Sequence, residues 1–165
     1  MDTVFCVELL LPAVDPDPEI NISSMIKEIA AAIPLLDYHP PLLFISAEND
    51  LQEADAILQS SGIRYELGTW LELDERWITE LRVLTDYGVA TPSGRTFIDL
   101  TLCAVMQLTC TEAGSELASA ILQAEEHAIA MKREDGRQLL AVDRQQIELL
   151  EGIARAYRCS TKRLI

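Results

Sequence analysis

The chain has 165 residues, of which 49% are hydrophobic, and 27 acidic against 13 basic residues give a formal net charge of −14. Enough apolar residues are present to bury a core, which excludes a disordered chain. The negative charge repels phosphate backbones and anionic lipid, so we expect neither nucleic acid nor a membrane as the partner.

The first half of the chain shows alternating strand and helix patterns. Three short apolar segments predict strands and two segments with apolar residues at helical spacing predict helices. The strands are expected at 3–11, 42–47 and 63–67, and the helices at 23–33 and from Asn49 or Asp50 to Gly62. This order predicts an α/β or α+β fold with an N-terminal βαβαβ-like mixed or parallel sheet.

The second half is predicted to be mostly helical, because no proline follows Pro92. Helices are expected at 75–87, 96–110 and 115–132, and from Asp143 onward. The segment 96–110 has apolar even positions, as in a strand, but its length favours a buried helix. Asp135-Gly136 reads as a turn that could be a tight hairpin. We expect a single domain over residues 1–165, with a subdivision into 1–70 and 71–165 left open.

The four cysteines are widely spaced and form no CxxC pair. Cys6, Cys103, Cys110 and Cys159 are therefore predicted to be free thiols in a reducing compartment, and Cys159 is the candidate for a lowered pKa. The first residues show no pattern of a secretory leader, and the longest uncharged stretch, 100–111, is too short to span a membrane. These observations predict a soluble, cytoplasmic protein.

Residues that could carry catalysis or hold a metal are few. Asp15 and Asp17 follow the first strand at a spacing used by some phosphate-transfer enzymes, but the neighbouring prolines favour a rigid turn. His39 and His127 have no partner at metal-ligand spacing, and no P-loop or glycine-rich dinucleotide motif is present. We expect no catalytic residue, metal or cofactor, and an enzyme is the less favoured class.

One polar loop could still serve a small ligand. Ser46, Glu48 and Asp50 follow the second predicted strand, and open α/β sheets bind ligands at the carboxyl ends of their strands. Capping of the next helix explains the same residues. A small-molecule-binding or enzymatic domain with its site here is therefore an alternative function.

The charge is unevenly placed along the chain. Residues 1–131 hold 22 acidic and 5 basic residues, a charge of −17, and residues 132–165 hold 5 acidic and 8 basic residues, a charge of +3, which together give −14. The positive excess lies near the end, in Arg155, Arg158, Lys162 and Arg163. A second candidate surface consists of acidic residues between Trp70 and Trp77. Its candidate residues are Trp70, Glu72, Asp74 and Glu75. Both groups are candidate partner-binding residues.

The end of the chain also resembles the start of a helix-turn-helix. Residues Ile153-Ala154 would lie on the first helix, and Ser160 would cap the second. The turn has Arg158 where glycine is usual, and the second helix would be too short to reach base edges. A transcriptional regulator that uses this segment is therefore a further alternative.

The function that these observations favour is binding of a partner protein. We expect a small acidic interaction or regulatory protein, such as an adaptor, an inhibitor or immunity-type protein, or a chaperone. Its acidic surface would steer a basic partner toward it. The apolar runs 100–108 and 121–129 could equally serve a homodimer or the core of a monomer.

Overall fold

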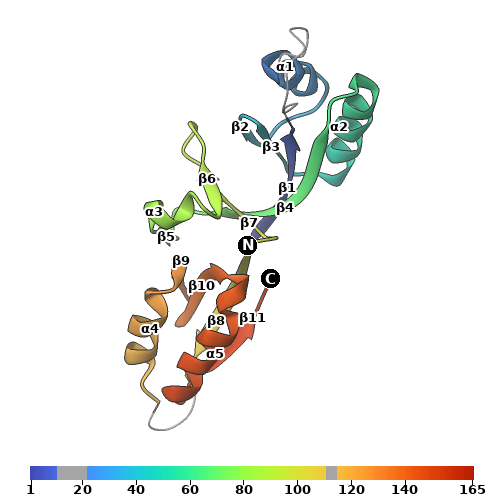
Figure 1. Cartoon of the computed structure of the whole chain (residues 1–165). Coiled ribbons are helices and arrows are strands. Elements are labelled where there is room, and N and C mark those ends of the chain that lie inside the picture. Colours follow the sequence, from blue (N-terminus) through green and yellow to red (C-terminus); the bar gives the residue numbers. More distant parts are fainter. Residues whose placement is uncertain (11–21, 111–114) are drawn as a thin grey trace. The chain divides into compact units, whose positions relative to one another are not determined.

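A computed structural model describes residues 1–10, 22–110 and 115–165 (Figure 1). The strands are β1 (Asp2–Leu9), β2 (Asp37–His39), β3 (Leu42–Ile45), β4 (Tyr65–Leu73), β5 (Ile78–Thr79), β6 (Gly88–Ala90), β7 (Thr96–Asp99), β8 (Cys103–Thr109), β9 (Ala128–Glu134), β10 (Arg137–Asp143) and β11 (Ser160–Arg163). The helices are α1 (Ile22–Ala32), α2 (Glu48–Ser61), α3 (Leu81–Leu84), α4 (Leu117–Glu125) and α5 (Ile147–Ala156), with a 3₁₀ turn at Arg144–Gln146. No helix of the described residues is long and apolar enough to cross a membrane.

The strands form two sheets, in the orders β2-β3-β1-β4-β7-β6 and β11-β8-β10-β9-β5. Strand β1 runs antiparallel to both β3 and β4, and β8 runs antiparallel to both β10 and β11. The predicted mixed or parallel sheet followed by a helical half is therefore wrong. Strand β2, which was not predicted, explains the first error, because it pairs with β3 as a hairpin and reverses the chain before β3 joins β1.

The chain divides into two compact units, Met1–Glu72 with Ala90–Phe97 and Leu73–Val89 with Ile98–Ile165. The first contains β1-α1-β2-β3-α2-β4 with the strand order β2-β3-β1-β4. The second contains β8-α4-β9-β10-α5-β11 with the strand order β9-β10-β8-β11. Element order and strand neighbours are the same, so each unit is built on one split β-α-β plan. The sequence analysis did not detect this repeat.

In the first unit, α1 and α2 pack on one face of the sheet. Val7 and Leu43 on the strands and Ile29 and Leu58 on the helices are fully buried there. Strand β1 and helices α1 and α2 thus lie where the sequence predicts a strand at 3–11 and helices at 23–33 and up to Gly62. Gly62 takes the left-handed φ of 72° that ends α2.

The other face of this sheet buries an aromatic cluster. Phe44 stacks on Phe97 with ring centroids 3.9 Å apart and meets Trp70 edge-on at 5.5 Å. The sheet curls until its ends approach: Thr91 donates a 2.6 Å hydrogen bond from its hydroxyl to Asp37 on β2, and Ser93 donates another. Burial raises the pKa of Asp37, but these hydrogen bonds outweigh it and hold that pKa below its ordinary value.

In the second unit, α4 and α5 pack against β8 and β10. Met106 and Leu140 of the strands and Ala124 and Leu150 of the helices form the centre of this core. The segment 96–110 is thus β7 and β8 rather than the predicted helix. Its alternating pattern was the correct signal, but two strands joined by a turn at residues 100–102 make a run too long for one strand, which favoured the helix.

The remaining helices are shorter than predicted. Only Leu81–Leu84 is helical within 75–87, because Asp74 accepts the backbone N–H of Arg76 in a turn instead of capping a long helix. The helix expected at 115–132 ends at Glu125, and the chain continues as β9. The hairpin at Asp135-Gly136 is confirmed, with positive φ at both residues. Asp15 and Asp17 lie outside the described residues.

The end of the chain departs from the predicted helix-turn-helix. After α5, Arg158 adopts a positive φ of 55° and residues Ser160–Arg163 form β11, so no second helix follows. Cys110 and Cys159 form a disulfide with Cα atoms 4.3 Å apart, so the prediction of free thiols is wrong for this pair. Cys6 and Cys103 are buried, as expected, and burial raises the pKa of the Cys103 thiol to about 12.

Candidate functional site

The best-defined candidate site is a groove in the second unit, which we call the β5–β9 groove. It lies where β5, the last strand of the five-stranded sheet, pairs with β9 through Ile78 opposite Met131 and Thr79 opposite Ala130. The groove has a volume of about 220 Å³. Its walls come from β5, α3, the end of α4 and β9, through Ile78, Thr79, Glu80, Val83, Glu125, Glu126, Ala128, Ile129, Ala130 and Met131.

The groove exposes apolar surface above an apolar floor. Ile129 and Ala130 are buried beneath it. Ile78 at its edge is 69% exposed, the highest fraction among the large hydrophobic residues described, and Val83 is also exposed. An exposed aliphatic side chain beside a concave apolar floor is typical of a surface that receives an apolar group.

The charge of the groove is negative. Glu80, Glu125 and Glu126 are among its lining residues, which include no lysine or arginine. Glu80 also caps α3 by accepting the backbone N–H of Arg82 at 3.4 Å, which holds the start of that helix against the groove. The lining therefore favours a ligand that is apolar at its centre and positively charged around it.

An ion-paired cluster around one buried lysine ties the chain that precedes β5 to β9. Lys132 of β9 is only 3% exposed, and its Nζ lies 2.8 Å from Asp74 Oδ2 and 3.2 Å from Glu134 Oε1. The same ammonium lies 5.9 Å from the ring centroid of buried Trp77. Because Trp77 directly precedes Ile78, these contacts position the outer wall of the groove.

Both carboxylates of this cluster have lowered pKa values. The hydrogen bond from the Arg76 guanidinium, followed by that from Lys132, holds the pKa of Asp74 well below its ordinary value. The hydrogen bond from Lys132 lowers the pKa of Glu134. Both groups are therefore ionised at neutral pH, and the cluster keeps its ion pairs over the whole physiological range.

The lining and the volume of the groove indicate what it can receive. Its side chains offer aliphatic surface, carboxylates and one threonine hydroxyl. Its volume lies below the range of about 300 to 1,000 Å³ that is usual for small-molecule sites, and it matches one or two side chains of a peptide. In the described ranges, no group of three or more His, Cys, Asp or Glu side chains is arranged to hold a metal ion.

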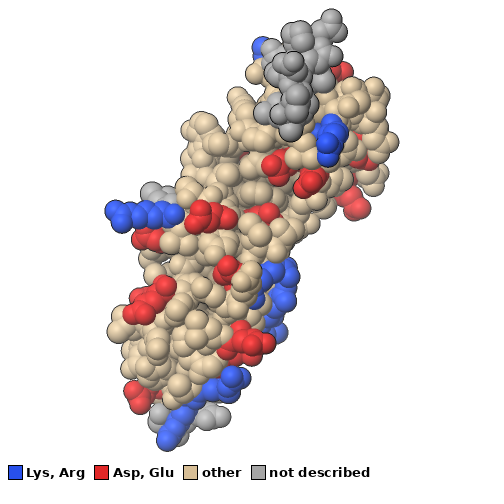
Figure 2. Space-filling view, in the orientation of Figure 1, with Lys and Arg blue, Asp and Glu red and all other residues tan. Residues whose placement is uncertain are grey.

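The tryptophan and acidic residues chosen from the sequence are divided between the two units. Trp70 is buried in the first unit, where Glu72 forms an ion pair with Arg95 at 3.0 Å. Asp74 belongs to the second unit and pairs with Lys132, and Glu75 next to it is also exposed. The side of the molecule drawn in Figure 2 shows acidic side chains spread over the surface, with basic ones among them.

The predicted ligand residues lie at the start of α2. Ser46 and Glu48 are exposed and Asp50 is half-buried. Glu48 and Asp50 lie in the first turn of the helix, where a negative charge interacts favourably with the helix dipole. Ala47 is the N-cap residue, so the expectation that Asn49 or Asp50 caps this helix is wrong.

The basic residues of the C-terminal segment lie on two elements and the turn between them. Arg155 on α5 is exposed and lies 3.9 Å from Glu151. Arg158 lies in the turn, and Lys162 and Arg163 are exposed on β11. The structure thus places two of the four predicted residues on an edge strand.

The first unit holds a larger cavity, of about 460 Å³, beside α1 and β2. Most of its lining is apolar, and it also includes one lysine and one aspartate. The lining residues are Ile26, Lys27, Ala30, Ile33, Pro34, Leu35, Leu36, Asp37 and Tyr38.

The β5–β9 groove was not predicted, because residues 75–87 were expected to form one long helix. A cluster of glutamates near isolated aliphatic residues was the available signal, but only pairing of β5 with β9 brings residues 78–83 to residues 125–131. Comparison with known proteins found no matching family model, no matching curated protein and no matching solved structure.

Proposed function

We propose that this protein acts by binding a partner protein, as an adaptor, inhibitor or chaperone, and that the β5–β9 groove receives the partner. The observation that carries the proposal is Ile78, exposed at the edge of a concave apolar floor that three glutamates surround. The segment that fits this surface has an apolar side chain flanked by lysine or arginine.

Ile78 and the glutamates of the groove would contribute to binding in different ways. Covering Ile78 removes most of its side chain from water, which stabilises a complex by about 1 to 2 kcal/mol. The glutamates Glu80, Glu125 and Glu126 accelerate the encounter with a basic segment and exclude acidic ones. The net charge of −14 acts in the same direction over longer distances.

The experiment is a selection of peptides from a random displayed library on the intact chain. We expect the selected peptides to share an apolar residue next to lysine or arginine, and to bind more weakly at high salt. The variant Ile78→Glu should weaken binding at least about tenfold, which corresponds to about 1.4 kcal/mol.

The matched control is Leu149→Glu, which introduces the same charge at an exposed leucine on α5. It should leave peptide binding unchanged, and circular dichroism should show that both variants are folded. Selected peptides without basic residues, or equal binding by wild type and Ile78→Glu, would refute the proposal.

The location of the protein has its own test, because the sequence predicts the cytoplasm whereas the Cys110–Cys159 disulfide favours an oxidising compartment. Disulfides persist in oxidising compartments and are rare in the cytosol. Rapid acid quenching of cells followed by thiol alkylation and mass spectrometry reports the state of Cys110 and Cys159. A cytoplasmic protein should show both cysteines alkylated, whereas an intact disulfide in the quenched cells would argue for another compartment.

The cavity of the first unit supports a second candidate function, binding of a small molecule. Its volume lies within the usual range for such sites, and its mostly apolar lining carries one cation, Lys27, and one anion, Asp37. These features fit an apolar molecule with one polar end group that interacts with Lys27. A thermal-shift series of medium-chain fatty acids tests it: stabilisation that Ala30→Trp abolishes would support binding there, and no stabilisation by any member would exclude it.

A further inference from the structure

The two repeats differ in what pairs with their last strand. In the first, the outer edge of β4 is paired with β7. The counterpart of β4 in the second repeat is β11, and in the part of the chain that the structure describes no strand pairs with the outer edge of β11. The outer edge of the last strand is therefore paired in the first repeat, and within the described residues it is unpaired in the second.

Strand β11 is held firmly along its inner side. It pairs with β8 from Ser160 opposite Thr109 to Arg163 opposite Met106. Beyond the strand, Leu164 donates its backbone N–H to the carbonyl of Val105 at 2.8 Å, and Val105 donates to Ile165 at 3.3 Å. The edge is thus ordered before any partner arrives, which reduces the entropic cost of adding a strand.

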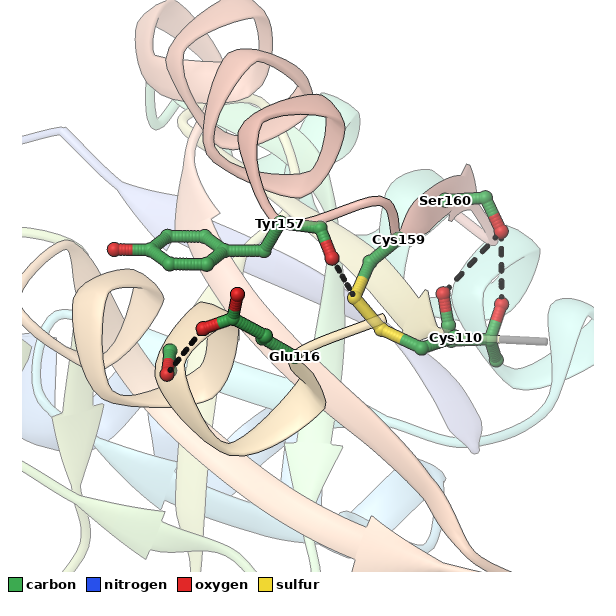
Figure 3. Close-up of a disulfide and its surroundings, with 7 residues drawn as sticks. Cys110, Glu116, Tyr157, Cys159 and Ser160 are labelled. Atoms are coloured by element: carbon green, nitrogen blue, oxygen red, sulfur yellow. Dashed lines mark hydrogen bonds between the residues drawn. A yellow bond between two sulfur atoms is a disulfide. The ribbon is translucent and has the colours of Figure 1, made fainter. Parts of the chain in front are cut away.

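The disulfide fixes the start of this strand (Figure 3). Cys110 follows β8 and Cys159 precedes β11, so the bond joins the residues next to the Ser160–Thr109 pair. The hydroxyl of Ser160 also lies 3.1 Å from that of Thr109. Covalent and hydrogen-bonded contacts together keep β11 from separating from β8.

Two features of β11 select what can pair with it. An antiparallel strand directs the backbone N–H and C=O groups of every second residue to its outer side, where they can bind another strand. Lys162 and Arg163 are exposed on this strand, and no acidic residue follows Glu151 in the chain. A second copy pairing β11 with itself would place these cations together, which is unfavourable.

We propose that the outer edge of β11 binds an extended, acidic segment of a partner protein as an added strand. Backbone hydrogen bonds would supply affinity. Because successive side chains of a strand point to opposite faces, Lys162 would select glutamate or aspartate on one face of the added strand and Arg163 would select it on the other. This surface is at the opposite edge of the five-stranded sheet from the β5–β9 groove, so it is independent of the proposed function and would engage a segment of opposite charge.

The test uses the full, disulfide-bonded chain and three fluorescent peptides that alternate Val with Glu, Thr with Glu, or Ile with Asp. At least one should bind, and hydrogen exchange should slow at residues 160–165. The double variant Lys162→Glu with Arg163→Glu should weaken that binding at least about tenfold. N-methylation of the peptide on both of its edges should abolish it, which bulk charge attraction alone would not explain.

The matched control is Arg133→Glu with Arg137→Glu, which changes the net charge equally at two exposed arginines of the β9–β10 hairpin. It should bind the peptide nearly as well as the wild type. The proposal is overturned if no peptide binds up to about 1 mM, which corresponds to about −4.1 kcal/mol. It is equally overturned by equal loss in both double variants, or by slowed exchange elsewhere than β11.

Discussion

Replacing Lys132 by methionine tests whether the ion-paired cluster around this buried lysine holds the wall of the β5–β9 groove. Lys132 is 3% exposed, with Asp74 and Glu134 within 3.2 Å of its ammonium. Methionine keeps most of the aliphatic stem against Trp77 but removes the charge. The two carboxylates, together with Arg76, then remain without their buried cation.

The expected loss of stability follows from how buried each partner is. Breaking a fully buried ion pair costs about 3 to 5 kcal/mol, and an exposed pair contributes about 0 to 1 kcal/mol. The lysine is buried but the side chain of Asp74 is 43% exposed, so Lys132→Met should destabilise the second unit by about 2 kcal/mol. Lys132→Ala also removes about three buried methylenes and should cost about 2 kcal/mol more.

Urea unfolding followed by tryptophan fluorescence measures both variants. The midpoint should fall while the slope m stays constant, because folded and unfolded states keep their compactness. The difference between wild type and Lys132→Met should shrink in acid. The folded pKa of Asp74 is depressed, so its stabilisation is complete above its unfolded pKa of about 4 and is lost as the pH falls toward the folded value.

The control is Arg133→Met on the same strand, where the side chain is exposed. It should change stability by less than about 0.5 kcal/mol. A Lys132→Met variant as stable as the wild type at neutral pH would refute the reasoning. So would a loss that does not decrease in acid.

Three further predictions concern other contacts. Replacing Cys110 and Cys159 by alanine should cost about 2 to 4 kcal/mol in urea unfolding, because the bond closes a loop with a sequence separation of 49; an unchanged midpoint would contradict this. Tyr87→Phe removes a 2.7 Å hydrogen bond to Asp143 and should cost about 1 kcal/mol. The hydrogen bond to Asp143 raises the pKa of Tyr87 to about 12, so its stabilisation should persist below pH 10 and fall as the pH rises toward 12; early ionisation of all tyrosines in an ultraviolet titration would contradict it. Asp37→Ala removes the acceptor of two hydroxyls that join the ends of the first sheet and should cost about 1 to 3 kcal/mol, with faster amide exchange in β2; unchanged exchange would argue that the contact does not close the sheet.

Local signals in the sequence identified those elements that depend on neighbouring residues. The apolar run of β1, the helical spacing of α1, Gly62 at the end of α2 and the Asp135-Gly136 hairpin were all predicted correctly. Each of these depends on side-chain periodicity or on a required backbone conformation.

Errors arose where pairing over long distances decides the structure. Strands β7 and β8 are separated only by a turn at residues 100–102, so their combined run was too long for one strand and was read as a helix. Strand β2 has only three residues and is specified by its hairpin with β3 rather than by its own composition. Without these strands, antiparallel sheets could not be distinguished from a parallel sheet with crossovers.

The candidate site could not be predicted for the same reason. The groove requires two-residue β5 to pair with β9, and nothing local marks so short a strand. The disulfide was likewise hidden, because Cys110 and Cys159 become neighbours only when β11 pairs with β8. The basic character of Lys162 and Arg163 was evident from the sequence, but their place on a sheet edge was not.

The most direct test of the proposed function is a titration of the isotope-labelled chain with a selected basic–apolar peptide, followed by amide and methyl NMR. Shifts centred on Ile78, Val83 and Ile129 that diminish at high salt are the predicted result. Shifts centred outside the β5–β9 groove, or equal shifts there with a peptide in which glutamate replaces every basic residue, would contradict it.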